Sequence, residues 1–394
     1  MSGERAFDLV LFGATGFTGG LIAHYLGKRL AGTPLRWAIA GRSKEKLSKV
    51  RRALEREDER LAGVELIEAR SDDPESLRAM ARRTRAIMTT VGPYARHGEP
   101  LVAACIDEGA HYLDLTGEPV WWKQMIERYH ARAEERGVMI IPCCGFDSIP
   151  ADLGALFTAS KLPADQPMHI EGFFSAKGQP SGGTWASLID AVSAMGGKQF
   201  GAEVKGKGSG AGRKQAVTER PRIHYVDALK RWAVPAPIID PLVVRRSASL
   251  RGEAYGSELH YQHYMALKNR VQIAGLGVFM GGLFLATRLE PTRKLVAGVR
   301  KQGEGPAPEV RAKSWFRVDF IGRGGGKEVR THVSGGDPGY DETAKMMSES
   351  AITLLEEESK GTLPLRGGVL TPASALGLAL VERLVAAGIV FAVD

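Results

Sequence analysis

The chain has 394 residues, of which 44% are hydrophobic, so it exceeds one ordinary domain and can bury sizeable cores. Its formal net charge of +8 favours acidic partners or surfaces, but no zinc, helix-turn-helix or aromatic RNA-binding signature accompanies this charge, so we expect no nucleic-acid partner. The three cysteines, Cys105, Cys143 and Cys144, are too few for a disulfide framework, and we expect a cytoplasmic protein.

A glycine-rich turn near the start is the first functional feature. The apolar stretch 7–12 precedes it and the helix-like stretch 21–26 follows it, an order typical of strand, tight turn and helix. Free N–H groups and the positive end of a helix stabilise a pyrophosphate at such a place. We therefore predict a nucleotide-binding turn that consists of Gly13, Ala14, Thr15, Gly16, Phe17, Thr18 and Gly19.

Basic residues follow the second predicted strand, at 37–40. An NAD-binding fold normally has an acidic residue here for the ribose hydroxyls, whereas this chain has Arg42, Ser43 and Lys44. A guanidinium can bond a 2′-phosphate in a bidentate way, and a carboxylate would repel it. This position therefore predicts NADP as the cofactor. The alternative is that Arg42 and Lys44 only begin a solvated helix.

Further apolar segments alternate with helical stretches rich in Ala, Leu, Arg and Glu. The segments are 64–67, 86–91, 111–115 and 138–141. This alternation predicts an α/β fold with a Rossmann-type, doubly wound parallel sheet.

The ligand of such a sheet lies along the carboxyl ends of its strands. This rule predicts that Ser71 and Asp72 lie near the adenine, although Asp72 has the alternative role of a helix cap before Pro74. The residues that the same rule assigns to the nicotinamide end are Val91, Gly92, Pro93 and Tyr94.

After about residue 150 glycine-rich connections separate strand-like segments, which indicates a second domain. We predict strands at 169–175, 243–250 and 315–321, with a glycine-rich hairpin loop at 323–327. These segments predict an α+β domain on a mainly antiparallel sheet, used for substrate binding and dimerisation. The last helix is predicted at 373–387.

Several short blocks are more specific than the glycine turn alone. They lie at 13–19, 40–42, 91–94, 111–118, 145–150, 181–184 and 370–377. Together they resemble the saccharopine dehydrogenase-like oxidoreductases, within them the trans-acting enoyl reductases, over nearly the whole chain. The resemblance implies hydride chemistry and a last helix that returns to the nucleotide domain. We therefore expect an NADP-binding domain at 1–150, completed by 340–394, and a substrate domain at 151–339.

The proton donor for hydride chemistry is harder to find in the sequence. Tyr94 would follow the fourth strand and Asp147 would lie near the end of the sixth, so both are candidates. Tyr94 has the alternative of packing its ring under the cofactor, and Asp147 of capping the next helix. Asp114 and Glu118 flank a loop that reaches toward the ribose or substrate, and their spacing gives no metal pattern, so we expect no metal.

Two segments of the second domain suggest further contacts. The basic, glycine-rich segment 199–215 predicts a mobile loop, with docking of an acidic carrier as its alternative. The uncharged run 271–287 is marginal for crossing a membrane. Three alternatives stay open for this run: burial in a dimer or substrate tunnel, peripheral membrane or lipid contact, and a true span.

The favoured hypothesis is an NADPH-dependent reductase of an enoyl thioester in lipid or polyketide metabolism, with a small-molecule or carrier-bound acyl substrate. One alternative is a saccharopine-type amino-acid dehydrogenase, which needs arginines that converge on substrate carboxylates. Arg245 and Arg246 lie on a predicted strand and would point to opposite faces, so they do not make that clamp. The other alternative is a non-catalytic dinucleotide-binding scaffold at a lipid surface. We expect a homo-oligomer.

Overall fold

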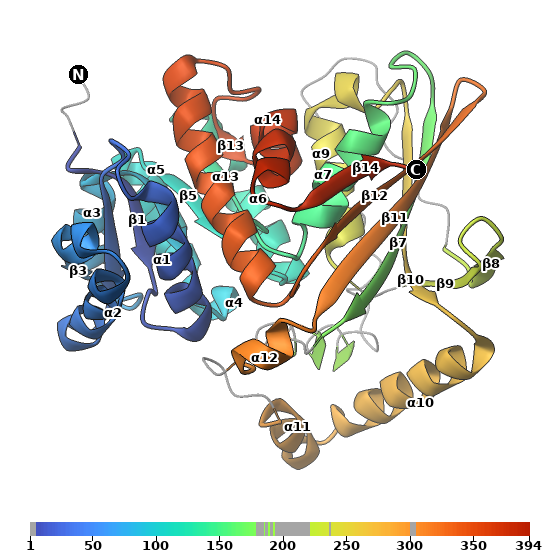
Figure 1. The fold of residues 1–394 in the computed structure, drawn as a ribbon, viewed down its shortest axis with the longest axis horizontal. Coiled ribbons are helices and arrows are strands. Elements are labelled where there is room, and N and C mark those ends of the chain that lie inside the picture. The colour runs from blue at the N-terminus through green and yellow to red at the C-terminus, as the bar shows by residue number, and fades with distance from the viewer. Residues whose placement is uncertain are drawn as a thin grey trace. The chain divides into compact units, whose positions relative to one another are not determined.

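The computed structural model describes residues 5–178, 185, 188–189, 192–193, 221–235, 238–299 and 305–394. Their contacts divide the chain into two units (Figure 1). Unit 1 consists of residues 1–149 and 340–387, and unit 2 of residues 150–339 and 388–394. The predictions for 181–184 and 199–215 lie outside the described residues.

Unit 1 is built on a seven-stranded parallel sheet with the order β13-β6-β5-β4-β1-β2-β3. The predicted Rossmann-type sheet is confirmed, because β3-β2-β1-β4-β5-β6 is the doubly wound order, with its switch point between β1 and β4. Both faces of β1 are covered, which explains its nearly continuous apolar sequence. The strands are β1 Phe7–Phe12, β2 Trp37–Gly41, β3 Glu65–Glu68, β4 Thr84–Thr89, β5 His111–Asp114, β6 Met139–Ile141 and β13 Gly368–Val369.

Helices cover both faces of the parallel sheet. Figure 1 shows α1 and α13 on one face, and α3, α5 and α6 on the other, as expected when connections leave the switch point in opposite directions. The helices are α1 Phe17–Leu30, α2 Lys44–Glu57, η1 Glu59–Gly63, α3 Pro74–Arg82, α4 Tyr94–His97, α5 Glu99–Glu108, α6 Pro119–Glu135, α13 Asp341–Lys360 and α14 Pro372–Ala386.

A buried carboxylate joins the C-terminal helices to α1. Glu349 on α13 is fully buried and accepts hydrogen bonds from Tyr25 Oη at 2.7 Å and from Arg29 Nε at 2.9 Å, both on α1. On α14, Arg383 Nη1 donates to the same carboxylate at 3.5 Å. These contacts fix the helix that follows the glycine turn, so residues more than 300 positions away in sequence help to position the turn.

Unit 2 is built on a mixed seven-stranded sheet with the order β14-β12-β11-β7-β10-β9-β8. Among these strands β7 and β10 pair in parallel and the other neighbours pair antiparallel, so the predicted mainly antiparallel sheet is confirmed. Gly325 and Gly326 have positive φ angles and form the predicted hairpin loop between β11 and β12.

Unit 2 contains the strands of this mixed sheet and several helices. The strands are β7 Met168–Lys177, β8 His224–Val226, β9 Arg231–Pro235, β10 Leu259–Leu267, β11 Trp315–Gly324, β12 Lys327–Gly335 and β14 Val390–Val393. The helices are α7 Ile149–Ala159, α9 Asp240–Leu250, η3 Gly252–Ala254, α10 Arg270–Ala286, α11 Glu290–Ala297 and α12 Pro308–Arg311. No helix in the described ranges combines the length and the apolar composition that a membrane span requires.

Two local predictions were wrong. The segment 243–250 is not a strand but most of helix α9, because Pro241 in the first turn favours helical backbone and the buried side chains recur at helical spacing. Arg245 and Arg246 are therefore neighbours on a helix. Residues 388–394 do not complete the nucleotide-binding domain: Gly388, at φ +91°, follows α14, and the chain then forms β14, which pairs with β12.

We predict that Glu349→Ala lowers the free energy of unfolding of the protein by about 1.5–3 kcal/mol, because Tyr25, Arg29 and Arg383, which are partly exposed, lose a buried charged hydrogen-bond partner. Urea denaturation followed by circular dichroism measures this change. Glu45→Ala is the control, since Glu45 forms an exposed pair with Lys49, and it should leave the curve unchanged. Equal curves for Glu349→Ala and the unmodified protein would contradict the role of Glu349.

Candidate functional site

The glycine turn packs so closely that a side chain at Gly13 or Gly19 would clash with neighbouring atoms. A Cβ atom on Gly19 would lie 2.1 Å from the carbonyl oxygen of Gly13. Gly13 itself has φ +95°, and a Cβ atom there would lie 2.6 Å from Oγ1 of Thr90 on the next loop. The turn is therefore restricted to glycine at both positions, and its backbone lies close to the start of α1.

The start of α1 is open toward an anion. Gly16 is the N-cap and has no side chain to cap the helix, and the first turn contains no acidic residue. Thr15 and Gly16 are exposed, Phe17 and Thr18 are half-buried, and Ala14 is buried. The ring of Phe17 packs edge-on against Tyr340 at 5.0 Å. Unsatisfied N–H groups at such a helix start fit a pyrophosphate.

Arg42 is available for a phosphate. It follows β2, is exposed, and makes no ion pair within the part of the chain that the structure describes. Ser43 Oγ caps α2 by accepting from Lys46 N at 3.3 Å, which leaves its hydroxyl proton free to donate. Lys44 is the first residue of α2 and is exposed. This basic group fits the 2′-phosphate that the sequence predicts.

Ser71 and Asp72 follow β3, but Asp72 is not a helix cap. Its carboxylate pairs with Arg70 through two bonds of 3.0 Å, which lower the pKa of Asp72. Asp73 is the residue that caps α3, by accepting from the N–H groups of Glu75 and Ser76. The structure leaves Ser71 half-buried in the turn after β3.

Two side chains hold the loop of Val91, Gly92, Pro93 and Tyr94, namely the half-buried Glu118 and the buried Tyr94. The Glu118 carboxylate accepts from Tyr94 N at 2.8 Å and from Ala95 N at 2.9 Å, so it caps α4. Tyr94 Oη donates to Thr89 O at 3.0 Å and accepts from Leu115 N at 3.2 Å. Because its proton is already donated to backbone, this geometry favours a structural role for Tyr94.

Asp114 ties together the loops after β5 and β6. This fully buried carboxylate accepts from Tyr112 Oη at 2.8 Å, from Thr116 N at 2.8 Å and from Cys143 N at 3.1 Å. Burial raises the pKa of Asp114 to about 7 even though these donors favour its charged form. Asp114 and Glu118 were predicted to reach the ribose or substrate, yet both bond the protein backbone.

Asp147 lies on the loop between β6 and α7. Phe146 N donates to Thr343 Oγ1 at 3.2 Å, and Ser148 N donates to Cys143 O at 3.0 Å, so both neighbours of Asp147 are fixed. None of the described residues bonds the half-buried Asp147 carboxyl, and the helix-cap alternative is therefore unsupported. Burial raises its pKa to about 6. The backbone on either side of Asp147 is thus fixed, and its carboxyl holds a proton up to about pH 6.

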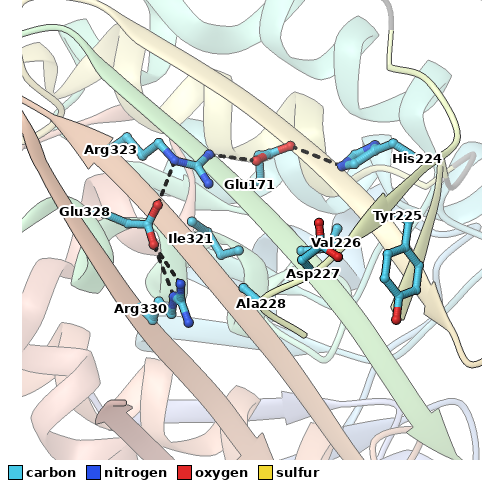
Figure 2. Close-up of a pocket in the computed structure, with 10 residues that line it drawn as sticks. All are labelled: Glu171, His224, Tyr225, Val226, Asp227, Ala228, Ile321, Arg323, Glu328 and Arg330. Carbon is cyan, nitrogen blue, oxygen red and sulfur yellow. Dashed lines mark hydrogen bonds and ion pairs between the residues drawn. The ribbon is translucent and has the colours of Figure 1, made fainter. Parts of the chain in front are cut away.

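A separate pocket in unit 2 was missed by sequence reasoning. Figure 2 shows its side chains, and its volume is about 600 Å³. Arg323 bonds Glu171 at 3.2 Å and Glu328 at 3.0 Å, and Arg330 bonds Glu328 at 3.0 Å. Arg323 lies on β11 and Arg330 on β12, and the register of these two strands brings both arginines to the pocket. The sequence alone does not reveal this register. Since glutamates already pair both arginines, this pocket is no carboxylate clamp.

The fold and the glycine turn together define a dinucleotide-binding α/β protein with a second, mixed-sheet unit. Comparison with known proteins agrees with this class. The family model of the saccharopine dehydrogenase NADP binding domain matches residues 9–141. The chain belongs to the saccharopine dehydrogenase-like family of oxidoreductases, and its cofactor is NADP.

The relatives cover nearly the whole chain. A Mycobacterium tuberculosis relative whose name includes the words trans-acting enoyl reductase is 35% identical over 98% of this chain and 97% of its own. The saccharopine dehydrogenase-like oxidoreductase of Rattus norvegicus is 32% identical over 99% and 98%. The lipid droplet localized protein of Caenorhabditis elegans is 30% identical over 94% of each chain.

A solved structure shows the same fold. Apo saccharopine dehydrogenase (L-Glu forming) from Saccharomyces cerevisiae matches with a TM-score of 0.55 over 98% of this chain and 99% of that one. The two sequences are 10% identical, so this likeness speaks for the fold alone.

We predict that Arg42→Asp weakens NADPH binding roughly 5–150-fold, the equivalent of about 1–3 kcal/mol, because a charge-assisted bond becomes a repulsion. NADH affinity should change little. Titration of nicotinamide fluorescence measures both dissociation constants. Arg52→Asp, an exposed position later on α2, is the charge-matched control and should bind NADPH normally. Equal losses for NADPH and NADH would show that Arg42 does not contact the 2′-phosphate.

Proposed function

We propose that the protein is an NADPH-dependent reductase of an enoyl thioester in lipid or polyketide metabolism. The observation that carries this proposal is Asp147, a half-buried carboxyl with a pKa near 6 on a fixed loop beside the carboxyl edge of a dinucleotide-binding sheet. The names of the mycobacterial relatives support the substrate class. The C. elegans relative is named for lipid droplets, which supports a lipid setting.

Reduction of an enoyl thioester adds a hydride to the β-carbon and a proton to the α-carbon, and converts the C=C bond to a single bond. Bound NADPH supplies the hydride. We assign the proton to Asp147, whose burial keeps the acid form populated near pH 6. Tyr94 is then a positioning residue, which joins the end of β4 to the loop after β5.

Residues at the carboxyl ends of the parallel strands would hold the cofactor. The turn from Gly13 to Gly19 would bind the pyrophosphate, and Arg42 with Ser43 and Lys44 the 2′-phosphate. Ser71 and Asp72 would lie toward the adenine. The loop from Val91 to Tyr94 would lie toward the nicotinamide, where its backbone is held by Glu118.

Arg245, Arg323 and Arg330 give the saccharopine-type alternative no support. Arg323 and Arg330 are paired with glutamates in the unit 2 pocket, and Arg245 donates to the carbonyl of Pro241 within α9. An amino-acid dehydrogenase needs arginines that are free to bind substrate carboxylates. The scaffold alternative gives no role to the Asp147 carboxyl, which none of the described residues bonds. We further propose a homo-oligomer in the cytoplasm, with an acyl substrate that is either free or carrier-bound.

Purified protein with NADPH and a long-chain enoyl thioester tests the proposed reaction. Loss of nicotinamide absorbance with the enoyl substrate, and none with saccharopine, is the expected result. The matching experiment with NADH should be much slower. Tight NADPH binding with no oxidation on free or carrier-bound enoyl thioesters would overturn the proposal and favour the scaffold.

We predict that Asp147→Asn lowers kcat roughly 10²–10⁴-fold without changing the dissociation constant of NADPH, because the amide cannot donate an acidic proton. Stopped-flow measurement of NADPH oxidation checks this. In the unmodified enzyme kcat should fall as the pH rises through about 6, since Asp147 then loses its proton. Asp147→Asn should lack this pH dependence.

Tyr94→Phe is the matched variant for this test. It removes a hydroxyl but, in this assignment, no transferred proton, so kcat should fall less than about tenfold. A large loss in Tyr94→Phe with full activity in Asp147→Asn would reverse the two roles.

A further inference from the structure

An apolar stripe on α10 and α11 is left uncovered by the described chain. Val271, Val278 and Leu285 recur every seven residues, so they share one face of α10. They are exposed by 79%, 79% and 70%. Further exposed apolar side chains follow at Leu289, directly before α11, and at Leu295 on α11, with exposures of 64% and 74%. Figure 1 shows that α10 follows β10 and leads directly into α11.

The opposite face of α10 is also apolar, and it holds the helix in the fold. Leu283 is buried in a cluster with Ile189 and Val192, and Met280 and Phe284 pack against this cluster. The exposed stripe is therefore not needed to attach α10 to the protein. Surplus apolar surface of this kind marks an interaction site.

Both ends of the stripe are basic. The positive residues are Lys268 and Arg270 before it, and Arg288 and Arg293 after it. The Arg270 guanidinium lies 4.9 Å from the centre of the Trp232 ring, and that of Arg288 lies 4.2 Å from the centre of the Phe284 ring. These contacts keep two charges at the ends of the helix. The sequence has no acidic residue between Glu258 and Glu290, and Glu290 pairs with Lys294.

We propose that this stripe docks the protein on an anionic phospholipid surface, with α10 in the plane of the interface. The apolar side chains enter the acyl region, and the basic ends bind headgroup phosphates. At 17 residues α10 is roughly 25 Å long, which suits a helix that lies on a membrane. A second copy of the chain fits less well, because neither parallel nor antiparallel pairing of two α10 helices brings opposite charges together.

Flotation of the full-length protein with vesicles tests this docking without any use of the proposed reaction. Vesicles of phosphatidylcholine with phosphatidylglycerol should carry the unmodified protein upward, and vesicles of phosphatidylcholine alone should carry less. The double variant Val278→Glu, Leu285→Glu should reduce the floated fraction at least roughly tenfold. The control is Val120→Glu, at a valine on α6 that is 55% exposed, and it should float normally.

The double variant Arg288→Glu, Arg293→Glu tests the electrostatic contribution to membrane binding. It should lose flotation with anionic vesicles and behave like the unmodified protein with neutral ones. NADPH binding in solution should be normal in every variant, which checks folding.

Two results would overturn the proposal. One is unmodified protein that fails to float with anionic vesicles, and the other is equal flotation of the Val278, Leu285 double variant. If the unmodified protein does not float and light scattering shows that this variant has a smaller mass, a second copy covers the stripe instead.

Discussion

The contact between the backbone at Gly13 and the start of α1 at Gly19 is the constraint on which the cofactor site depends. A single methyl group at Gly19 would lie 2.1 Å from a carbonyl oxygen, so any other residue would move the helix away from the turn. The position of α1 is fixed a second time by Glu349, whose buried carboxylate joins α1 to both C-terminal helices of unit 1. The anion site is thus formed by local backbone and supported by distant sequence.

A second set of side chains orders the loops at the carboxyl ends of β4, β5 and β6. Asp114 joins the loops after β5 and β6, and Glu118 caps α4 beside the loop after β4. The Tyr94 hydroxyl links the end of β4 to the loop after β5. These side chains bond backbone groups, whereas none of the described residues bonds the Asp147 carboxyl, although the backbone on either side of it is fixed. That difference distinguishes a group that positions loops from one that can exchange a proton.

The sequence predicted the parallel sheet and the glycine turn well, because strand composition and helix starts are local signals. Predictions from the sequence were wrong or incomplete where tertiary contacts determine the local structure. The valines of α9 suggested a strand, but Pro241 and a buried helical face determine a helix. The sequence placed Asp114 and Glu118 beside a loop that reaches toward the ribose or substrate, and only the fold shows that they bond backbone N–H groups. The pairing of Arg323 and Arg330 with glutamates depends on strand register, which the sequence does not specify.

Transfer of deuterium from NADPH to the acyl product decides whether the protein reduces an enoyl thioester with hydride from its cofactor. Protein is incubated with NADPH deuterated at the nicotinamide C4 position and a long-chain enoyl thioester, and the product is analysed by mass spectrometry. A reductase of this kind gives a saturated thioester with one deuterium at the β-carbon when the transferring face of the nicotinamide is labelled. A saturated product without deuterium from either labelled face, or unchanged enoyl thioester despite bound NADPH, would contradict this reaction.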